Sequence, residues 1–328
     1  MKTIAFFNNK GGVGKTSLIY HLGFMFAEMG KRVLLADFDP QANLSSMCLS
    51  EERLETLWGM QPRHTIYGAV EKLKRGVADV VPVTPEAVSS RIVLIAGDLQ
   101  LSEFEDDLSQ QWPKCLDRDE RAFRVTTSLQ RVANSAGTQH GTDIALLDVG
   151  PNFGAINRAA LISADYIVVP VAPDLFSMQG LENVGPKLRD WRTGWQERRE
   201  RAPKLDFVLS TGTMRSLGYV VSRHSVLSGG AVKAFQRWID RMPAVYRRSF
   251  SEPNPNPSME VGSDPYCLAQ FKDYRSLMPL SQEAKKPMFL LRPADGAIGG
   301  HQGAVRQAYD DFRHLASRIL KKIQEQPS

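Results

Sequence analysis

The stretch FFNNKGGVGKTSL, from Phe6 to Leu18, decides the fold of this chain. It follows a short apolar run, and its glycines lead into GKTS, a pattern typical of a strand, a phosphate-binding turn and then a helix. Two lysines, Lys10 and Lys15, stand on either side of the first glycines. One lysine is enough to hold a phosphate in such a loop, so the other needs its own explanation.

The residues of this loop suit nucleotide binding. Small glycines let backbone N–H groups wrap a phosphate, and the helix that follows adds the partial positive charge of its N-terminus. We expect Lys15 to reach the β- and γ-phosphates and the Thr16 hydroxyl to hold Mg²⁺. The loop is a variant, because Asn9 stands where the usual GxxxxGK[ST] pattern has its first glycine. The predicted nucleotide-binding residues of the loop are Gly11, Gly12, Val13, Gly14, Lys15, Thr16 and Ser17.

The composition is that of an ordinary globular protein. The chain has 328 residues, of which 42% are hydrophobic and 23% are charged, so it can form one large domain or two small ones. No apolar run approaches the roughly 18 residues that a membrane span needs, and we expect no signal peptide. The three cysteines, Cys48, Cys115 and Cys267, are widely spaced, which argues against a disulfide framework and for a cytoplasmic protein.

The charge is divided unevenly along the chain. Residues 1–180 hold 17 Lys/Arg against 21 Asp/Glu, a net of −4, and residues 181–328 hold 24 against 15, a net of +9. A basic half can form a surface for a polyanion. The other interpretation is a solvated face rich in arginine, which charge alone slightly favours.

Short apolar runs alternate with segments of helical period. Runs without polar alternation are typical of strands buried on both faces, and their alternation with helices predicts a parallel sheet. We therefore predict an α/β, single-domain P-loop fold with a twisted, mostly parallel sheet, helices on both faces, and insertions. The predicted strands are Ile4–Phe7, Val33–Ala36, Ile92–Ala96, Ile144–Leu147, Tyr166–Val171, Phe207–Leu209 and Met288–Leu291.

Two stretches look like additions to this core, residues 54–116 and residues 218–273. Within the second, SFSEPNPNPSMEVGSDP (residues 249–265) is dense in Pro, Ser and Asn and predicts an exposed loop. The final predicted helix, about Gly303 to Ile323, has an apolar face, which indicates packing on the core.

Three carboxylates follow predicted strands. Asp37 and Asp39 come after Val33–Ala36, and Asp148 ends the run Ile144–Leu147. The carboxyl ends of parallel strands share one edge of a sheet, so these side chains should lie near the phosphates.

Several segments together resemble the ParA/MinD family of P-loop ATPases with a deviant Walker A motif. KGGVGKT resembles that motif, and ADFDPQANLS (residues 36–45) resembles the segment that follows the second strand of ParA proteins. IALLDVGPNFGAINRAAL (144–161) resembles the Walker B region, and ADYIVVPVAPDLFSMQGLENV (164–184) and SQEAKKP (281–287) resemble later family segments. The resemblance covers roughly residues 1–50, 140–212 and 276–322, in family order.

The resemblance implies an ATPase that uses ATP and Mg²⁺ and hydrolyses slowly until a partner stimulates it. Lys10 would act across a homodimer on the phosphates bound by the other subunit, beside Lys15 and Asp39 as the catalytic residues. Asp39 would position the attacking water, and Asp37 and Asp148 would join Thr16 in the Mg²⁺ shell. The adenine base would lie near Leu209–Thr213 and Met278–Ser281.

The resemblance also implies partners: non-specific DNA, a ParB-like adaptor or cargo, and a cytoplasmic location on the nucleoid if DNA is bound. The sharpest basic cluster is WRTGWQERRERAPK (residues 191–204). Further candidates for DNA contacts are Arg189, Arg215, Arg223, Arg247, Arg248, Lys272 and Arg275. These arginines could equally face a protein partner.

Other members of the wider family leave alternatives. A MinD-like protein that cycles on membrane would need a basic amphipathic tail, and the ending QEQPS is polar, so we expect no membrane partner. An iron-protein reductase would need two clustered cysteines, which the spacing excludes. A small-molecule synthetase or kinase with the same loop stays open.

Overall fold

The computed structural model describes residues 1–222, 229–250, 259–272, 274 and 276–325. Within these residues, eight strands form one sheet in the order β3-β4-β2-β5-β1-β6-β7-β8. Neighbouring strands are parallel except at the β3–β4 edge, which is antiparallel. The strands are β1 (Lys2–Phe6), β2 (Val33–Asp37), β3 (Glu86–Ser89), β4 (Ile92–Ile95), β5 (Ile144–Asp148), β6 (Tyr166–Val171), β7 (Arg215–Ser222) and β8 (Cys267–Phe271).

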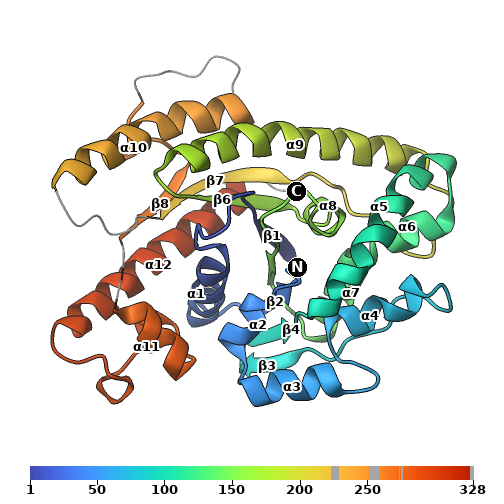
Figure 1. The fold of residues 1–328 in the computed structure, drawn as a ribbon, viewed down its shortest axis with the longest axis horizontal. Helices are drawn as coiled ribbons and strands as arrows, with labels where there is room; N and C mark the ends of the chain where they lie inside the picture. The colour runs from blue at the N-terminus through green and yellow to red at the C-terminus, as the bar shows by residue number, and fades with distance from the viewer. Residues whose placement is uncertain (223–228, 251–258, 273, 275, 326–328) are drawn as a thin grey trace.

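Helices cover both faces of the sheet (Figure 1). A separate apolar core fills the space on each side. One face carries α1 (Lys15–Glu28), α2 (Asn43–Cys48), α3 (Glu51–Gly59), α11 (Leu277–Ala284) and α12 (Gly300–Glu325). The other carries α4 (Ile66–Lys74), α5 (Glu105–Lys114), α6 (Glu120–Thr126), α7 (Ser128–Gln139), α8 (Ala155–Ile162), α9 (Leu175–Glu200) and α10 (Gly229–Phe250). Four 3₁₀ turns join them: η1 (Leu99–Phe104), η2 (Cys115–Asp117), η3 (Met288–Leu290) and η4 (Pro293–Asp295).

The predicted fold class is confirmed. The central strands β1, β2, β5 and β6 coincide with predicted runs to within two residues, and they are buried on both faces. This burial explains why their sequences show apolar runs without polar alternation. The closing helix is also confirmed as α12, because Ala308, Phe312, Leu315 and Ile319 pack inward on the core.

Two predicted strands are wrong. Phe207–Leu209 is irregular chain, and the guanidinium groups of Arg124 and Arg131 stack on the Phe207 ring instead, at 5.4 and 4.5 Å from its centroid. Residues 288–291 form η3 and its cap, where Met288 donates its backbone N–H to the His21 ring rather than to a strand. In both places, apolar side chains pack on neighbouring helices or side chains without extending the sheet.

Three strands were missed, β3, β7 and β8. Their sequences EAVS, RSLGYVVS and CLAQF contain polar residues that weaken the apolar signal. Strand β4 lies within residues 54–116, and β8 and most of β7 lie within residues 218–273, so both stretches contribute to the sheet. Their status as insertions stays a prediction. Residues 251–258 of the predicted exposed loop, together with Arg223, Arg275 and residues 326–328, lie outside the described residues.

Candidate functional site

Three neighbouring strands bring the predicted site residues together at their carboxyl ends. The glycine loop follows β1, Asp37 and Asp39 follow the apolar part of β2, and Asp148 ends β5, which lies between β1 and β2. Asp37 and Asp148 are direct partners in the β2–β5 register. The sheet therefore places two carboxylates side by side next to the glycine loop, as the sequence predicted.

The glycine loop has the backbone that its sequence requires. Gly12 and Gly14 adopt positive φ angles of 72° and 81°, a region that favours glycine. Gly14 is also the N-cap of α1, and in the described chain no side chain caps this helix end. The first N–H groups of α1 are thus left open for an anion, and the helix dipole favours negative charge there.

Asn8 shapes the start of this loop, a role that we did not predict from the sequence. Its side chain is fully buried, donates from Nδ2 to the Pro170 carbonyl at 2.7 Å, and accepts from the Lys10 N–H at 3.0 Å. These bonds tie the loop to the end of β6. A polar residue directly after an apolar strand was the signal that could have identified it.

Lys15 lies inside the site with its charge close to the carboxylates. Only 7% of its surface is exposed, and its Nζ donates to the Lys10 carbonyl at 3.3 Å. Burial lowers the pKa of Lys15, while the nearby charges of Asp148 and Asp39 act in the opposite direction. A phosphate would be a further anionic partner for this buried ammonium group.

Asp37 and Asp148 are fully buried, and both hold oxygens that lack a hydrogen-bond partner among the described residues: Oδ1 of Asp37 and both carboxylate oxygens of Asp148. Ser45 donates to Asp37 Oδ2 from its N–H and its hydroxyl, at 2.8 and 2.7 Å. Burial raises the pKa of Asp37 to about 7, against the Ser45 hydrogen bonds and with a contribution from Asp39. Burial and the Asp37 charge raise the pKa of Asp148 well above its usual value, while the nearby Thr16 hydroxyl acts in the opposite direction without forming a hydrogen bond of good geometry.

These orphaned carboxylate oxygens fit a magnesium ion. Mg²⁺ prefers oxygen ligands, and proteins commonly hold it with one or two carboxylates while phosphates and water fill the other positions. No group of three or more His, Cys, Asp and Glu side chains suited to a metal occurs in the described part of the chain. The donor set of Asp37, Asp148 and Thr16 therefore suits a metal that arrives with a phosphate ligand.

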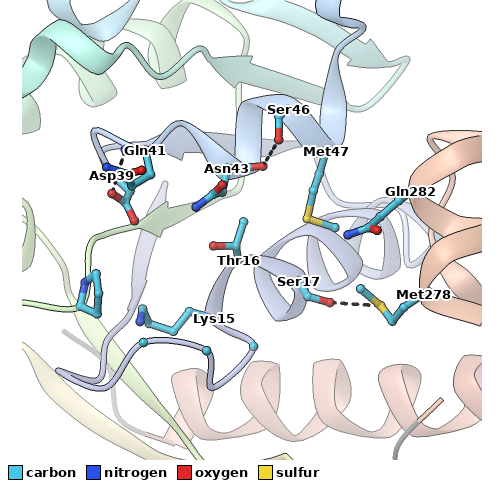
Figure 2. A pocket seen from close by; sticks show the side chains of 14 residues that line it. Lys15, Thr16, Ser17, Asp39, Gln41, Asn43, Ser46, Met47, Met278 and Gln282 are labelled. Atoms are coloured by element: carbon cyan, nitrogen blue, oxygen red, sulfur yellow. Dashed lines mark hydrogen bonds between the residues drawn. The ribbon is translucent and has the colours of Figure 1, made fainter. Parts of the chain in front are cut away.

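A cavity of about 470 Å³ opens above the loop (Figure 2). Figure 2 shows Lys15, Thr16 and Asp39 around one part of it and Met47, Met278 and Gln282 around another. Asp39 is mostly buried, and its Oδ1 accepts the N–H of Gln41 at 3.0 Å. The remaining lining residues are Gly11, Gly12, Gly14, Ser17, Gln41, Asn43, Ser46 and Pro151.

A second cavity of about 250 Å³ shares Gly14, Ser17 and Met278 with the first and has a more apolar wall. Phe271, Tyr274, Met288 and Phe312 contribute to this wall. An apolar pocket beside a phosphate loop is suited to a nucleotide base. Met278, one of the residues predicted near the base, lines both cavities.

The other segment predicted near the base, Leu209–Thr213, is elsewhere. Thr213 donates to the carbonyl of Asp165, just before β6 begins, so this segment lies at the amino ends of the strands. It precedes β7, whereas Ser222 at the far end of β7 bonds to the Val13 carbonyl at 3.1 Å. The resemblance placed this segment near the base, and that expectation is wrong, because the chain reaches the glycine loop only at the far end of β7.

Lys10 points away from the cavity within its own chain. Its Nζ forms an ion pair with Asp174, which also caps α9 by accepting the Ser177 N–H at 2.9 Å. The Phe176 ring lies beside this pair, 6.0 Å from Lys10 Nζ, and is 68% exposed. Because both partners of this ion pair are partly exposed, the pair is weak enough to exchange for another partner.

Two further residues organise the loop that follows β5. Asn157 on α8 is buried, accepts the Gly150 N–H at 3.1 Å, and donates to the Gly150 and Asn152 carbonyls, both at 2.8 Å. Glu105, from the acidic run EFEDD, caps α8 by accepting the N–H groups of Ala155 and Ile156. The Glu105 contact joins residues about 50 positions apart, so no local pattern predicts it, and we did not predict the Asn157 role either.

The basic cluster of residues 191–204 does not form one face. Trp191, Trp195 and Arg198 are buried, and the Arg198 guanidinium lies 4.1 Å from the Trp112 ring centroid. Arg247 is also buried, in an ion pair with Asp264 at 2.9 Å. These two arginines are removed from the candidates for DNA contacts. Arg189, Arg201, Arg248 and Lys272 are exposed.

Comparison with known proteins identifies a family and several relatives. A family model described as an AAA domain matches residues 1–197. Protein IncC from Escherichia coli is 31% identical over 184 residues, which cover 56% of this chain and 44% of IncC. Chromosome partitioning protein ParA from Caulobacter vibrioides is 30% identical over 182 residues, which cover 55% of this chain and 60% of ParA. The chain thus matches less than two thirds of the length of these curated relatives.

Among solved structures, protein DIP2308 from Corynebacterium diphtheriae is similar over nearly the whole fold. The TM-score is 0.72 with 25% sequence identity, over 98% of this chain and 99% of that protein. No helix in the described part of the chain is both long and apolar enough to cross a membrane.

Proposed function

Because the chain belongs to the ParA/Soj-like family of partition ATPases, we propose that it hydrolyses ATP, dimerises with ATP bound, and in that state binds DNA without sequence preference. It would use this cycle to position or segregate DNA or another cargo. The observation that carries the proposal is the glycine loop, where open helix N–H groups, the buried Lys15 and Asp39 line one cavity, and the buried carboxylates of Asp37 and Asp148 end the neighbouring strands.

ATP would lie across the two adjoining cavities. Its phosphates would contact the N-terminus of α1 and Lys15, and its base would enter the apolar cavity between Met278 and Tyr274. Asp37, Asp148 and Thr16 would hold Mg²⁺, which supplies charge neutralisation on the phosphates. Asp39, on the wall of the phosphate cavity, would orient the attacking water.

Lys10 would serve the nucleotide of a second subunit. A lysine supplied in trans neutralises phosphate charge only when the partner has docked, so nucleotide binding and dimerisation become linked. In the monomer, Lys10 would stay in its ion pair with Asp174. Dimerisation would exchange this exposed carboxylate for the partner's phosphates.

DNA binding would use the exposed basic residues of the second half of the chain. Its net charge of +9 supports an electrostatic contact with phosphates, and the dimer would double the number of contacts. A ParB-like adaptor or cargo protein would stimulate hydrolysis, and the protein would lie in the cytoplasm on the nucleoid. We also propose that the whole chain forms one ATPase domain.

The test is fluorescence anisotropy with a labelled random DNA duplex, measured with Mg²⁺-ATP, with Mg²⁺-ADP and without nucleotide, across a salt series. We expect binding with ATP only, and a steep loss as salt rises, because each phosphate contact releases a counterion. Absence of binding at low salt with Mg²⁺-ATP would reject the DNA part of the proposal. Equal DNA binding with ATP, with ADP and without nucleotide would show that the basic surface binds DNA independently of the nucleotide state.

A further inference from the structure

His21 is a fully buried polar residue on α1, one helical turn after Ser17. Its ring stacks on Phe312 of α12, with centroids 4.9 Å apart and planes at 18°, and its centroid lies 6.0 Å from that of the Phe289 ring. The His21 ring thus joins the helix that follows the glycine loop to the C-terminal part of the chain. A histidine buried in this way needs partners for both ring nitrogens.

Both ring nitrogens of His21 have backbone partners. The N–H of Met288 donates to Nε2 at 3.1 Å, and Nδ1 lies 2.7 Å from the Ser17 carbonyl. A backbone N–H only donates and a carbonyl only accepts, so Nε2 is unprotonated and Nδ1 carries the proton. Burial lowers the pKa of His21 to about 4, against the hydrogen bond to Ser17, so the ring is neutral near neutral pH. Two backbone groups therefore hold His21 in one neutral tautomer.

The bond from Met288 fixes the start of η3 relative to α1, although the two residues are 267 positions apart. Met288 is the first residue of η3, so its N–H has no acceptor within that turn. A buried N–H without a partner is costly, and His21 Nε2 supplies the missing acceptor. The position of η3 thus depends on one ring nitrogen of His21.

The residues that His21 contacts form one side of the apolar cavity of about 250 Å³. Ser17, Met288 and Phe312 all line this cavity. Met278 lines it as well, and its Sδ accepts from Ser17 Oγ at 3.6 Å (Figure 2). The His21 side chain has no exposed surface, so it can act on a ligand only through these neighbours.

We propose that His21 is a positioning residue for the nucleotide base. Helix α1 offers the phosphates its open N-terminal N–H groups, while η3 and α12 supply Met288 and Phe312 to the wall of the base cavity. His21 fixes the distance between these two parts of the site, so the base meets its wall while the phosphates lie on the glycine loop. Such preorganisation raises affinity because little has to be ordered on binding. This role rests on the proposed position of ATP.

The test compares ADP with inorganic pyrophosphate, each with Mg²⁺, by isothermal titration calorimetry on the full chain, with pyrophosphate measured by displacement of ADP. The ratio of the two affinities measures what adenosine adds to the phosphates. His21→Asn can still donate to the Ser17 carbonyl but is too short to reach Met288. His21→Gln is longer, and its amide oxygen can accept the Met288 N–H.

We expect His21→Asn to bind ADP about tenfold more weakly, because a buried N–H in the wall loses its acceptor. Its affinity for pyrophosphate should stay within about twofold of that of the parent. His21→Gln should stay within about threefold of the parent for both ligands. The two variants form a matched pair, because both lose the stacked ring and only one keeps an acceptor for Met288.

Three results would overturn the proposal. They are an unchanged ADP affinity in His21→Asn, an equal loss of ADP affinity in the two variants, and a loss as large for pyrophosphate as for ADP. The last result is the one that a merely structural role of His21 would give. A parent that binds ADP no more tightly than pyrophosphate would reject the proposed base site itself, and with it this role.

A measurement on the parent keeps the test independent of how the variants fold. With ¹⁵N-labelled histidine, the NMR signals of His21 should show a protonated Nδ1 and an unprotonated Nε2 at neutral pH. A protonated Nε2 would exclude the bond from Met288 and overturn the proposal. Tyr20→Phe is the control on the same helix, since the Tyr20 hydroxyl is buried and has no hydrogen-bond partner among the described residues. It should bind both ligands as the parent does.

Discussion

The carboxylates after β2 and β5 and the arginines of α9 are two dense groups of charge that the fold treats differently. Asp37 and Asp148, far apart in the sequence, become neighbours because their strands are adjacent and parallel. The arginines of residues 191–204 are close in sequence, yet Arg198 is buried on Trp112 and Arg201 is exposed. Successive residues of a helix point about 100° apart, so neighbours in a helix diverge.

Charges that follow a strand and charges within a helix therefore differ in how well the sequence predicts their positions. A charge placed directly after an apolar strand has a defined position, because the strand ends share one edge of the sheet. A charge within a basic run on a helix can be in the core, on a backbone carbonyl or in solvent. Spacing after a strand therefore predicts a site more reliably than local density does.

The largest effect should come from Lys15→Ala. This variant removes a buried cation at the centre of the carboxylate group, so ATP affinity should fall by roughly 2–5 kcal/mol, the usual cost of losing one partner of a buried charge pair. Calorimetric titration with Mg²⁺-ATP checks this. ATP binding close to that of the parent would show that the carboxylate edge is not the nucleotide site.

Asp39→Ala should slow the reaction and leave binding intact. The side chain lies on the cavity wall, so its removal should lower the hydrolysis rate by about 10²–10⁴-fold, the range for a group that assists proton transfer. An ATP-bound dimer should then accumulate. Phosphate release measured under saturating ATP checks the rate, and an unchanged rate would move the assignment to Asp37.

The arginines of α9 provide the matched test on the other side of the comparison. Arg198→Gln should lower the free energy of unfolding by about 1–3 kcal/mol, since it removes a guanidinium packed on Trp112 and bonded to its carbonyl. Arg201→Gln should change it by about 0.5 kcal/mol or less, as for other surface sites. Denaturant unfolding compares them, and equal values would contradict the distinction between the two positions.

A pH effect should arise from Asp37, whose pKa is raised to about 7. The folded protein holds a proton there that the unfolded chain releases near the usual pKa of 3.8. Without nucleotide, the free energy of unfolding should therefore fall as pH rises from about 4 to about 7 and change little above that. A metal ligand must be deprotonated, so Mg²⁺ in the presence of ATP should bind about tenfold more weakly at pH 6 than at pH 8. In the Asp37→Asn variant, the pH dependence of Mg²⁺ affinity should shrink to the part that the titration of ATP alone produces.

Much of the fold and of the phosphate site could be predicted from the sequence, for a definite physical reason. The central strands are buried on both faces, and the glycine loop needs residues that adopt positive φ. Both constraints act on consecutive residues. Strands β7 and β8 were missed because their sequences mix polar and apolar residues at the side of the sheet.

Other parts of the site could not be predicted because they depend on residues far apart in the chain. Asn8 holds the glycine loop through Pro170 on β6, which is 162 residues away in the chain. Lys10 and Asp174 form an ion pair although they are 164 residues apart in the chain. No local pattern specifies contacts of this kind.

We expect Lys10 to link the nucleotide of one subunit to the docking of another. The most direct measurement is mass in solution by light scattering, with and without Mg²⁺-ATP, for the parent, Lys10→Ala and Asp174→Asn. We predict that the parent and Asp174→Asn become dimers with ATP, and that Lys10→Ala binds ATP but stays a monomer. A Lys10→Ala variant that dimerises with ATP as the parent does would contradict the account.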